Sequence, residues 1–378
     1  MQVAIVTETW PPEVNGVALT VQSLARGLRA LGHAVEVVRP RRPEDDAATV
    51  DAFDELLVTS AALPRYPGLR FGLPAAARLS AHWRARRPDA LYIATEGPLG
   101  HSALAASRKL GIPACTGFHT RFDDFARHYG VGWLTPLVFA GMRRFHNRAA
   151  ATLVPTRELA DFLSARGFRH VRQLARAVDT SAFHPRHRDE ALRADWGVDA
   201  EAPAIVHVGR LAAEKNLDLL VRAFRAIQKR QPSARLVIVG DGPERARLAA
   251  AHPDLVFAGL RHGTDLARHY ASADLFLFPS KTETFGNVTL EAMASGVPVV
   301  AYDYGAAREH IADADTGVRV PFGDADAFVV AAGDLAHDDA RRARMAVSAR
   351  RAVEDLDPTR VSANFAALLA DLRPALAA

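Results

Sequence analysis

Cysteine is almost absent from the 378-residue chain, because Cys115 is the only one. A single cysteine excludes an internal disulfide framework and a cysteine-based zinc site, so Cys115 is expected to be structural. No apolar run reaches the roughly 18 residues that a membrane-spanning helix needs. The N-terminal stretch "MQVAIVTETW" lacks a basic flank and carries Glu8 too early for a signal peptide, so a cytoplasmic protein is expected.

Lysine is scarce as well, since only four of the 47 basic residues are lysines: Lys109, Lys215, Lys229 and Lys281. The chain has no Lys-rich arm, no zinc-finger spacing and no aromatic RNA-binding motif. These absences argue against a nucleic-acid partner.

Positive charge is nevertheless concentrated in one part of the chain. Residues 1–180 contain 23 Lys or Arg and 16 Asp or Glu, whereas residues 181–378 contain 24 and 27, giving +7 and −3 within the net +4. A basic N-terminal part suits peripheral contact with the anionic inner membrane. An Arg-rich solvated surface explains it equally well, and the sequence leaves both open.

The hydrophobic pattern is that of a two-domain globular protein. Hydrophobic residues make up 49% of the chain, and its length suits two domains of ordinary size. Short β-branched runs alternate with amphipathic helical stretches in both halves, which predicts two Rossmann-like α/β domains with doubly wound parallel sheets. We place them at residues 1–183 and 184–357, because the junction "ARAVDTSAFHPRHRDE" is polar and aperiodic.

Loops that follow strands carry the candidate chemistry, because ligands of such sheets bind outside the carboxyl ends of the strands. After the first strand, Gly16 stands just before a helix whose N–H groups could face an anion. His119 directly follows another strand and could transfer a proton or bind a sugar hydroxyl. A structural histidine is the alternative.

Two loops of the second half suit a sugar nucleotide. In "HVGRLAAEKN" a strand is expected to end at Gly209, and Arg210 and Lys215 follow it. The planar guanidinium of arginine can bind two oxygens and the lysine ammonium can neutralise charge, so the pair suits a diphosphate. The alternative makes Lys215 an ordinary surface charge.

The second of these loops, "SKTETFGNVTLEAM", sets Glu283 and Glu291 on either side of a predicted helix start near Asn287. The N–H groups of residues 285–287 would face an anion there, and each carboxylate could accept a pair of vicinal hydroxyls. A capping box from Ser280 to Glu283 is the competing interpretation.

Taken together, these motifs resemble glycosyltransferase family 4, the retaining enzymes of GT-B architecture, whose two Rossmann-like domains face a central cleft. The resemblance runs through "PPEVNGVA", "FHT", "VGRLAAEKN", "VGDGPE", "ETFGNVTLEAMASGVPVVA" and "GVRVP". It implies that the first domain takes the acceptor, the second takes the donor, and the helix at residues 358–378 packs back on the first domain. Within the family, "ETFGNV" resembles mannosyl- and glucosyltransferases that act on lipid or glycan acceptors. Of these, the chain is expected to resemble the bacterial GDP-mannose-dependent α-mannosyltransferases, such as phosphatidylinositol mannosyltransferases. A UDP-glucose- or UDP-N-acetylglucosamine-dependent transferase is the alternative.

The resemblance also implies roles for individual residues. His119, Arg210, Lys215 and Glu283 would be catalytic, with the two cations neutralising the departing diphosphate and His119 beside the transferred sugar. The donor-binding residues would be Gly16, Gly209, Phe285, Gly286, Asn287, Val288 and Glu291, with Glu291 on the ribose. Thr284 departs from the small or apolar residue of many members.

The expected reaction needs neither a cofactor nor a metal, since the nucleotide sugar is itself the substrate. A metal-dependent transferase would want an Asp-x-Asp motif, and "DAD" occurs at Asp313–Asp315 and Asp324–Asp326, where helix capping is the better explanation. A non-catalytic two-lobed sugar-binding protein is the alternative from another class, although such proteins are usually exported.

The acceptor is expected to be a lipid or a glycan. The helical stretch "TPLVFAGMRRFHNRAAA" places Leu134, Val138, Met142 and Phe145 on one face. Such a face either lies on a membrane surface or, more commonly, faces the core.

Overall fold

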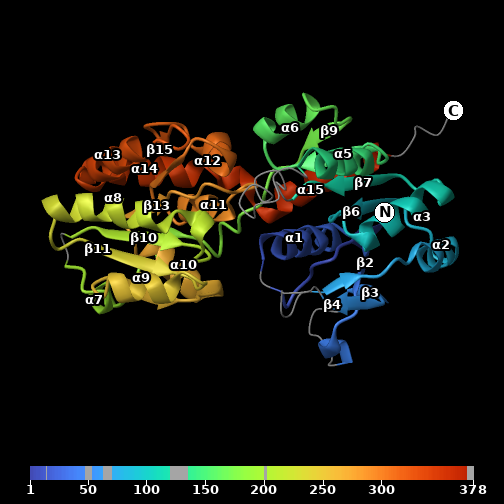
Figure 1. Ribbon diagram of the computed structural model, residues 1–378, viewed down its shortest axis with the longest axis horizontal. Helices are drawn as coiled ribbons and strands as arrows, with labels where there is room; N and C mark the ends of the chain where they lie inside the picture. The colour runs from blue at the N-terminus through green and yellow to red at the C-terminus, as the bar shows by residue number, and fades with distance from the viewer. Residues whose placement is uncertain (14, 47–52, 63–69, 120–134, 200–201, 373–378) are drawn as a thin grey trace. The chain divides into compact units, whose positions relative to one another are not determined.

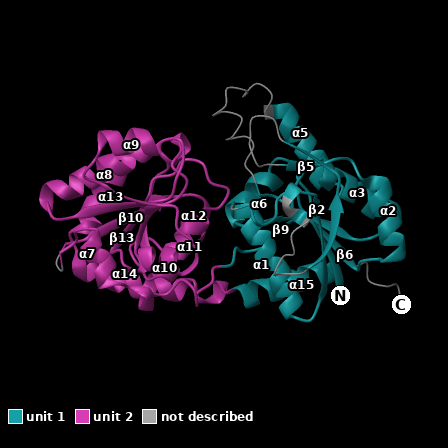
Figure 2. Ribbon diagram, turned by 90° about the horizontal axis from the view of Figure 1, so that it is seen from below, with its two compact units in different colours: residues 1–177, 358–378 teal, residues 178–357 magenta. Residues whose placement is uncertain are grey.

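The computed structural model describes residues 1–13, 15–46, 53–62, 70–119, 135–199 and 202–372. The chain folds into two compact units (Figures 1 and 2): unit 1 is residues 1–177 and 358–378, and unit 2 is residues 178–357. No described helix is both long and apolar enough to span a bilayer.

Unit 1 is built on a seven-stranded sheet in the order β3-β2-β1-β6-β7-β8-β9, in which every pair is parallel. Strands β4 and β5 form a separate antiparallel pair. In chain order the elements are β1 (Gln2–Val6), α1 (Gly16–Ala30), β2 (Ala34–Pro40), the 3₁₀ turn η1 (Pro43–Asp46), β3 (Asp54–Val58), β4 (Ser60–Ala62), β5 (Arg70–Gly72), α2 (Ala76–Ala85), β6 (Ala90–Ile93), α3 (Pro98–Leu110), β7 (Ala114–Gly117), α5 (Thr135–His146), β8 (Ala151–Val154), α6 (Arg157–Ser164), β9 (Val171–Gln173) and α15 (Pro358–Asp371).

Alternating residues of β1 supply the two cores of unit 1, because successive side chains of a strand point to opposite faces. Val3 and Ile5 pack with buried residues of α1 and of the C-terminal helix α15, including Phe365. Ala4 and Val6 pack on the other face with residues of α2 and α3. The sheet is therefore covered on both faces, as a parallel sheet requires.

Unit 2 repeats this plan with a six-stranded parallel sheet in the order β12-β11-β10-β13-β14-β15. Its elements are η3 (Pro185–His187), α7 (Glu190–Asp195), β10 (Ala204–Val208), η4 (Ala213–Lys215), α8 (Leu217–Arg230), β11 (Arg235–Val239), α9 (Arg245–Ala251), β12 (Val256–Gly259), α10 (Gly263–Ala271), β13 (Leu275–Phe278), α11 (Asn287–Ala294), β14 (Val299–Tyr302), α12 (Gly305–His310), β15 (Gly317–Val320), α13 (Ala325–Ala336), α14 (Asp339–Ala352) and η5 (Glu354–Leu356). Residues of α8 and α13 cover one face, and residues of α10 and α11 cover the other. The prediction of two doubly wound α/β domains is confirmed.

The boundary between the units falls after Ala177, upstream of the expected position at residue 183. Residues 178–183 are tied to unit 2 by hydrogen bonds. Arg350 donates to the carbonyls of Thr180 (2.8 Å) and Phe183 (2.7 Å), and the Val178 N–H donates to the Leu356 carbonyl at 2.9 Å. The ring of Phe183 also packs against the core of unit 2. The aperiodic segment 178–183 therefore belongs to unit 2, which supplies hydrogen-bond partners for its backbone.

Candidate active site

The loops after β10 and β13 meet at the point in unit 2 where the strand order reverses. The two strands are neighbours, but the chain leaves β10 towards β11 and leaves β13 towards β14, on opposite sides. Such a switch point at the carboxyl ends of the strands is where doubly wound sheets bind ligands.

Backbone contacts hold these two loops together. The Lys281 N–H donates to the Glu214 carbonyl at 3.1 Å, and the Asn216 side-chain amide donates to the Pro279 carbonyl at 3.3 Å. Each contact joins one loop to the other, so side chains on both loops are held at a fixed separation.

An ion pair between the same loops brings together two of the predicted catalytic residues. The Lys215 ammonium donates to Oε1 of Glu283, and the two side chains are each 15% exposed. The Ser280 hydroxyl donates to the same carboxylate oxygen at 2.9 Å, and Tyr304 donates to the Ser280 carbonyl at 2.8 Å. The Glu283 carboxylate is thus held in one orientation, with its charge balanced by Lys215.

The start of α11 offers backbone donors beside this pair. Gly286 adopts φ +93°, a conformation that favours glycine, and no side chain caps the helix. Within the described part of the chain, the N–H groups of Phe285, Gly286 and Asn287 have no hydrogen-bond partner. Val288 follows in the first turn, half-buried. The helix begins at Asn287 as predicted, and its N-terminus is open to an anion.

The capping-box interpretation of Ser280 and Glu283 is wrong. A capping box requires a helix that begins right after the serine, whereas α11 begins only at Asn287. The Ser280 hydroxyl donates to the Glu283 carboxylate instead of accepting a hydrogen bond from a backbone N–H.

Glu291 lies one turn into α11 and is fixed by a tyrosine. The hydroxyl of the fully buried Tyr270 donates to Oε2 of Glu291 at 2.8 Å. Burial raises the pKa of the Glu291 carboxyl, and the Tyr270 hydrogen bond opposes that rise. Within the described residues Oε1 has no partner, so it can accept a hydrogen bond from a ligand hydroxyl.

Arg210 is placed differently from Lys215. Its side chain is exposed and makes no hydrogen bond or ion pair with any other described residue. Beneath the loop, His207 donates from Nδ1 to the Leu277 carbonyl at 3.0 Å, and its Nε2 lies 3.7 Å from the position of a Cβ added at Gly209. Burial lowers the pKa of His207 to about 4, so the ring is neutral.

In unit 1, Gly16 begins α1 as expected, but two N–H groups of that helix are already occupied. The N-cap Asn15 accepts from Val17 at 3.1 Å and from Ala18 at 2.9 Å. Gly16 itself is exposed.

His119 follows β7 and contacts two side chains. The Arg176 guanidinium donates to Nδ1 at 2.6 Å, and Nε2 lies 2.7 Å from the Tyr92 hydroxyl. Because a guanidinium only donates, Nδ1 must accept, and Nε2 carries the proton and donates to Tyr92. Burial, with a smaller effect of Arg176, places the pKa of His119 well below its usual value. His119 is therefore a neutral ring of fixed tautomer, which suits positioning better than proton transfer.

Sequence reasoning missed the side chains that hold the predicted residues in place. Ser280 forms a hydrogen bond with Glu283, and Tyr270 forms one with Glu291. Arg176 and Tyr92 both form hydrogen bonds with His119. Arg176 left the clearest signal, since it lies in the loop after a strand, in the polar stretch "ARAVDTSAF".

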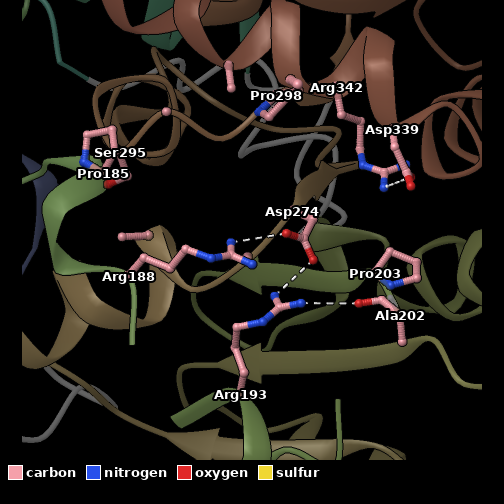
Figure 3. A pocket seen from close by; sticks show the side chains of 15 residues that line it. Pro185, Arg188, Arg193, Ala202, Pro203, Asp274, Ser295, Pro298, Asp339 and Arg342 are labelled. Carbon is pink, nitrogen blue, oxygen red and sulfur yellow. Dashed lines mark hydrogen bonds and ion pairs between the residues drawn. The ribbon is translucent and has the colours of Figure 1, made fainter. Parts of the chain in front are cut away.

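Two other features of unit 2 lie away from this site. A cavity of about 340 Å³ (Figure 3) is lined by Pro203, Asp274 and Pro298, each just before a strand and so at the opposite edge of the sheet. Of the aspartates in the two "DAD" motifs, Asp324 is the N-cap of α13, as expected. No cluster of three or more metal-binding side chains occurs among the described residues.

Comparison with known proteins gives the family. Residues 14–182 match the model described as Glycosyltransferase Family 4, and residues 202–338 match the one described as Glycosyl transferases group 1. The chain is 38% identical over 356 residues to a GDP-mannose-dependent alpha-mannosyltransferase of Mycobacterium tuberculosis, covering 93% of this chain and 92% of that protein. The chain belongs to glycosyltransferase family 4. The non-catalytic sugar-binding alternative is thereby set aside.

Further similarities agree with this family. A GDP-mannose-dependent alpha-mannosyltransferase of Mycolicibacterium smegmatis is 37% identical, covering 93% of this chain and 92% of that protein. The fold resembles that of the sucrose-phosphate synthase of Thermosynechococcus elongatus, with a TM-score of 0.78 at 19% identity, covering 98% of this chain and 99% of that one. This family 4 chain is thus a hexosyltransferase with the two-domain GT-B fold.

Proposed function

We propose that this glycosyltransferase transfers mannose from GDP-mannose to a lipid acceptor with retention of configuration. The observation that carries the choice of donor is the 38% identity over 93% of the chain to a protein named a GDP-mannose-dependent alpha-mannosyltransferase. Another relative, 31% identical over 84% of the chain, is named a GDP-mannose-dependent alpha-(1-6)-phosphatidylinositol dimannoside mannosyltransferase, which supports a lipid acceptor.

The geometry of unit 2 supports a role for each residue of the donor site. The open N–H groups of Phe285, Gly286 and Asn287 would bind phosphate oxygens, and Oε1 of Glu291 would accept from the ribose. The close approach of the phosphates to Gly209 would bring Arg210 and Lys215 to the diphosphate.

Glu283 would hold the transferred sugar through its hydroxyls. In the ligand-free state its carboxylate is bound to Lys215. Donor binding would then replace that contact, because the ammonium moves to the diphosphate while the carboxylate accepts from the sugar.

In the proposed reaction the acceptor hydroxyl attacks the anomeric carbon on the face from which GDP departs. The new C–O bond forms as the bond to the phosphate oxygen breaks, and the hydroxyl proton passes to the departing phosphate. Positive charge held at the leaving group stabilises such a step electrostatically, which is usually the largest single contribution. Arg210 and Lys215 would take the place of a divalent ion, so no metal is required.

Helix α5 is the proposed contact with an anionic membrane. Met142 and Phe145 on the predicted face are buried in unit 1, whereas Leu137 is 72% and Val138 is 42% exposed. Leu134 lies outside the described residues. The exposed leucine and valine precede Arg143 and Arg144, and apolar side chains next to basic ones suit an interfacial helix.

A panel of nucleotides tests the donor. GDP, UDP and ADP, each alone and joined to mannose, glucose or N-acetylglucosamine, are compared by thermal shift and by transfer to vesicle-borne phosphatidylinositol or diacylglycerol lipids, with and without EDTA. A nucleotide at 100 times its Kd stabilises the native state by about 2.7 kcal/mol, which is several degrees in Tm. GDP should give the largest shift and EDTA little effect.

Other outcomes of the panel have definite meanings. If UDP gave the largest thermal shift, the assignment of GDP-mannose as donor would be overturned, while the proposed roles of the donor-site residues would remain. Loss of turnover in EDTA with recovery on adding a metal would overturn the metal-free mechanism.

A further inference from the structure

Buried arginines in the described part of the chain almost always have a carboxylate partner. Arg39 binds Asp45 and Glu55, Arg42 binds Glu13, Arg193 binds Asp274, and Arg342 binds Asp339. Figure 3 shows the last two of these pairs. The pairing follows from the high cost of removing a charge from water without a partner.

Arg176 is the exception. Its side chain is nine-tenths buried, and its one hydrogen bond to another described residue goes to a neutral ring nitrogen, Nδ1 of His119. Burial lowers the pKa of the Arg176 guanidinium, as expected for a cation without a counter-ion. The protein therefore buries one positive charge that no described carboxylate neutralises.

The position of this charge suits a ligand. Arg176 follows β9 and His119 follows β7, so both lie at the carboxyl edge of the unit 1 sheet, where doubly wound sheets bind ligands. Glu96, the carboxylate in the loop after β6, is paired with a different residue, because its Oε1 lies 3.1 Å from Nε2 of His146.

The chemistry at this position favours an oxyanion. A guanidinium has five donors in a planar fork, and one N–H of Arg176 is used by His119, so others can bind two oxygens of one group. His119 adds no charge because it is neutral, so among the described residues Arg176 supplies the positive charge of this site. A carboxylate carries one negative charge and a single phosphate group carries one or two, whereas a diphosphate carries more.

We propose that Arg176, held by His119, is an oxyanion-binding site of unit 1 that takes a negatively charged phosphate or carboxylate group on the acceptor. The existence of the site is independent of the function proposed above. Its assignment to the acceptor rests on that function.

A binding experiment with small probes tests the site without any need for turnover. Glucose 6-phosphate, glucuronate and glucose differ only at C6, which carries a phosphate in the first, is the carboxylate carbon in the second and carries a hydroxyl in the third. They are titrated into the full-length protein while the ring ¹⁵N signals of His119 are followed by NMR. Both anions should bind at least tenfold more tightly than glucose. Arg176→Gln, which can still donate to His119, should remove that preference, and Arg176→Lys should restore part of it.

The same titration with pyrophosphate separates the two substrates. Its affinity should fall in Lys215→Gln and stay unchanged in Arg176→Gln. The opposite result would place the donor diphosphate at Arg176 and overturn the acceptor assignment. Absence of any Arg176-dependent anion binding would overturn the site itself.

Thermal stability distinguishes this role from a structural one. Arg39, in the same unit, is buried between two carboxylates and provides a matched control. Arg39→Gln should lower Tm by several degrees, whereas Arg176→Gln should leave Tm unchanged or raise it, because it removes a charge that no described carboxylate compensates. An equal loss in both variants would make Arg176 structural and refute the proposal.

Transfer kinetics complete the assignment. For an acceptor lipid with an anionic headgroup, Arg176→Gln should raise KM at least tenfold, and for a neutral glycolipid it should change KM less than twofold. Equal changes for both lipids would refute the acceptor assignment. If no mannose is transferred to any lipid, the proposed function fails while the probe titration still decides the site.

Discussion

The Lys215–Glu283 ion pair allows a quantitative test of the donor site. Glu283→Gln removes the carboxylate that would hold the sugar, and Lys215→Gln removes the ammonium that would neutralise the diphosphate. Each side chain is 15% exposed, so either change also leaves its former partner mostly buried without a counter-ion. Both variants should therefore lose activity and some stability.

The expected magnitudes follow from hydrogen bonds to charged groups. Such a bond contributes about 1.5 to 3 kcal/mol, which corresponds to roughly 10- to 150-fold in rate if it forms only in the transition state. A partly exposed unpaired charge should cost about 1 to 3 kcal/mol of stability, or roughly 2 to 10 °C in Tm for a unit of this size. The double variant should lose less stability than the sum of the single variants, because the two side chains share one contact in the ligand-free state. The losses in kcat should be close to additive, because in the donor complex the two side chains would act on separate groups.

The assay compares kcat, GDP affinity and Tm for the four proteins of this cycle, with Lys229→Gln as a control for an exposed lysine. Lys215→Gln should weaken GDP binding, and Glu283→Gln should chiefly lower kcat. Near-normal turnover in a folded Glu283→Gln variant would refute the sugar-binding role. A double variant that loses no more kcat than one single variant would refute the exchange of partners on donor binding, because the two residues would then act on one group.

Four further predictions concern single residues. His119→Ala should reduce transfer far more than it weakens GDP binding, and a kinetic assay beside a binding titration would show equal losses if this is wrong. GDP affinity should fall on acidification through the raised pKa of Glu291, and the difference between wild type and Glu291→Gln should disappear at low pH. Between pH 6.5 and about 4, His207 binds a proton in the unfolded state but not in the folded state. The free energy of unfolding therefore falls by up to about 1.4 kcal/mol per pH unit as the pH is lowered through that range. His207→Phe should reduce this pH dependence, as measured by thermal melts at several pH values. Gly286→Ala, at φ +93°, should cost about 1 to 2 kcal/mol of stability and weaken GDP binding, whereas an unchanged GDP titration would refute the backbone site.

The fold was predictable because the strands that build the sheet centres are short, continuous apolar runs. β1, β10 and β13 are buried almost throughout, so periodicity finds them directly. Edge strands were harder, since β9 is largely exposed and has only three residues. An exposed edge strand such as β9 is defined by backbone pairing with its neighbour β8, and no local hydrophobic pattern shows that pairing.

The candidate site was predictable where function follows from position after a strand, as for Lys215 and Glu283. Contacts made across long sequence separations were not. Tyr270 reaches Glu291 from α10, and Arg176 reaches His119 from 57 residues away. The capping-box alternative was plausible because the local pattern fits, and only the positive φ of Gly286 shows where the helix begins.

The two units use the same position in their sheets in opposite ways. In unit 1 the helix after β6, the neighbour of β1, has its N-terminus closed by Glu8, which accepts from the Leu99 N–H at 3.0 Å and from the Gly72 N–H at 2.6 Å. A Cβ at Gly97 would lie 2.2 Å from the same carboxylate, so no space remains for a ligand anion there.

In unit 2 the helix after β13, the neighbour of β10, has no carboxylate in that place and keeps its first N–H groups unpaired within the described residues. A phosphate and a protein carboxylate compete for the same helix terminus, because both satisfy the same donors and the same positive helix end. The unit that has filled this position with its own side chain cannot also hold the donor phosphate there. We therefore expect the nucleotide to bind to unit 2. Arg176, the buried cation of unit 1 that no described carboxylate balances, would then serve the other substrate.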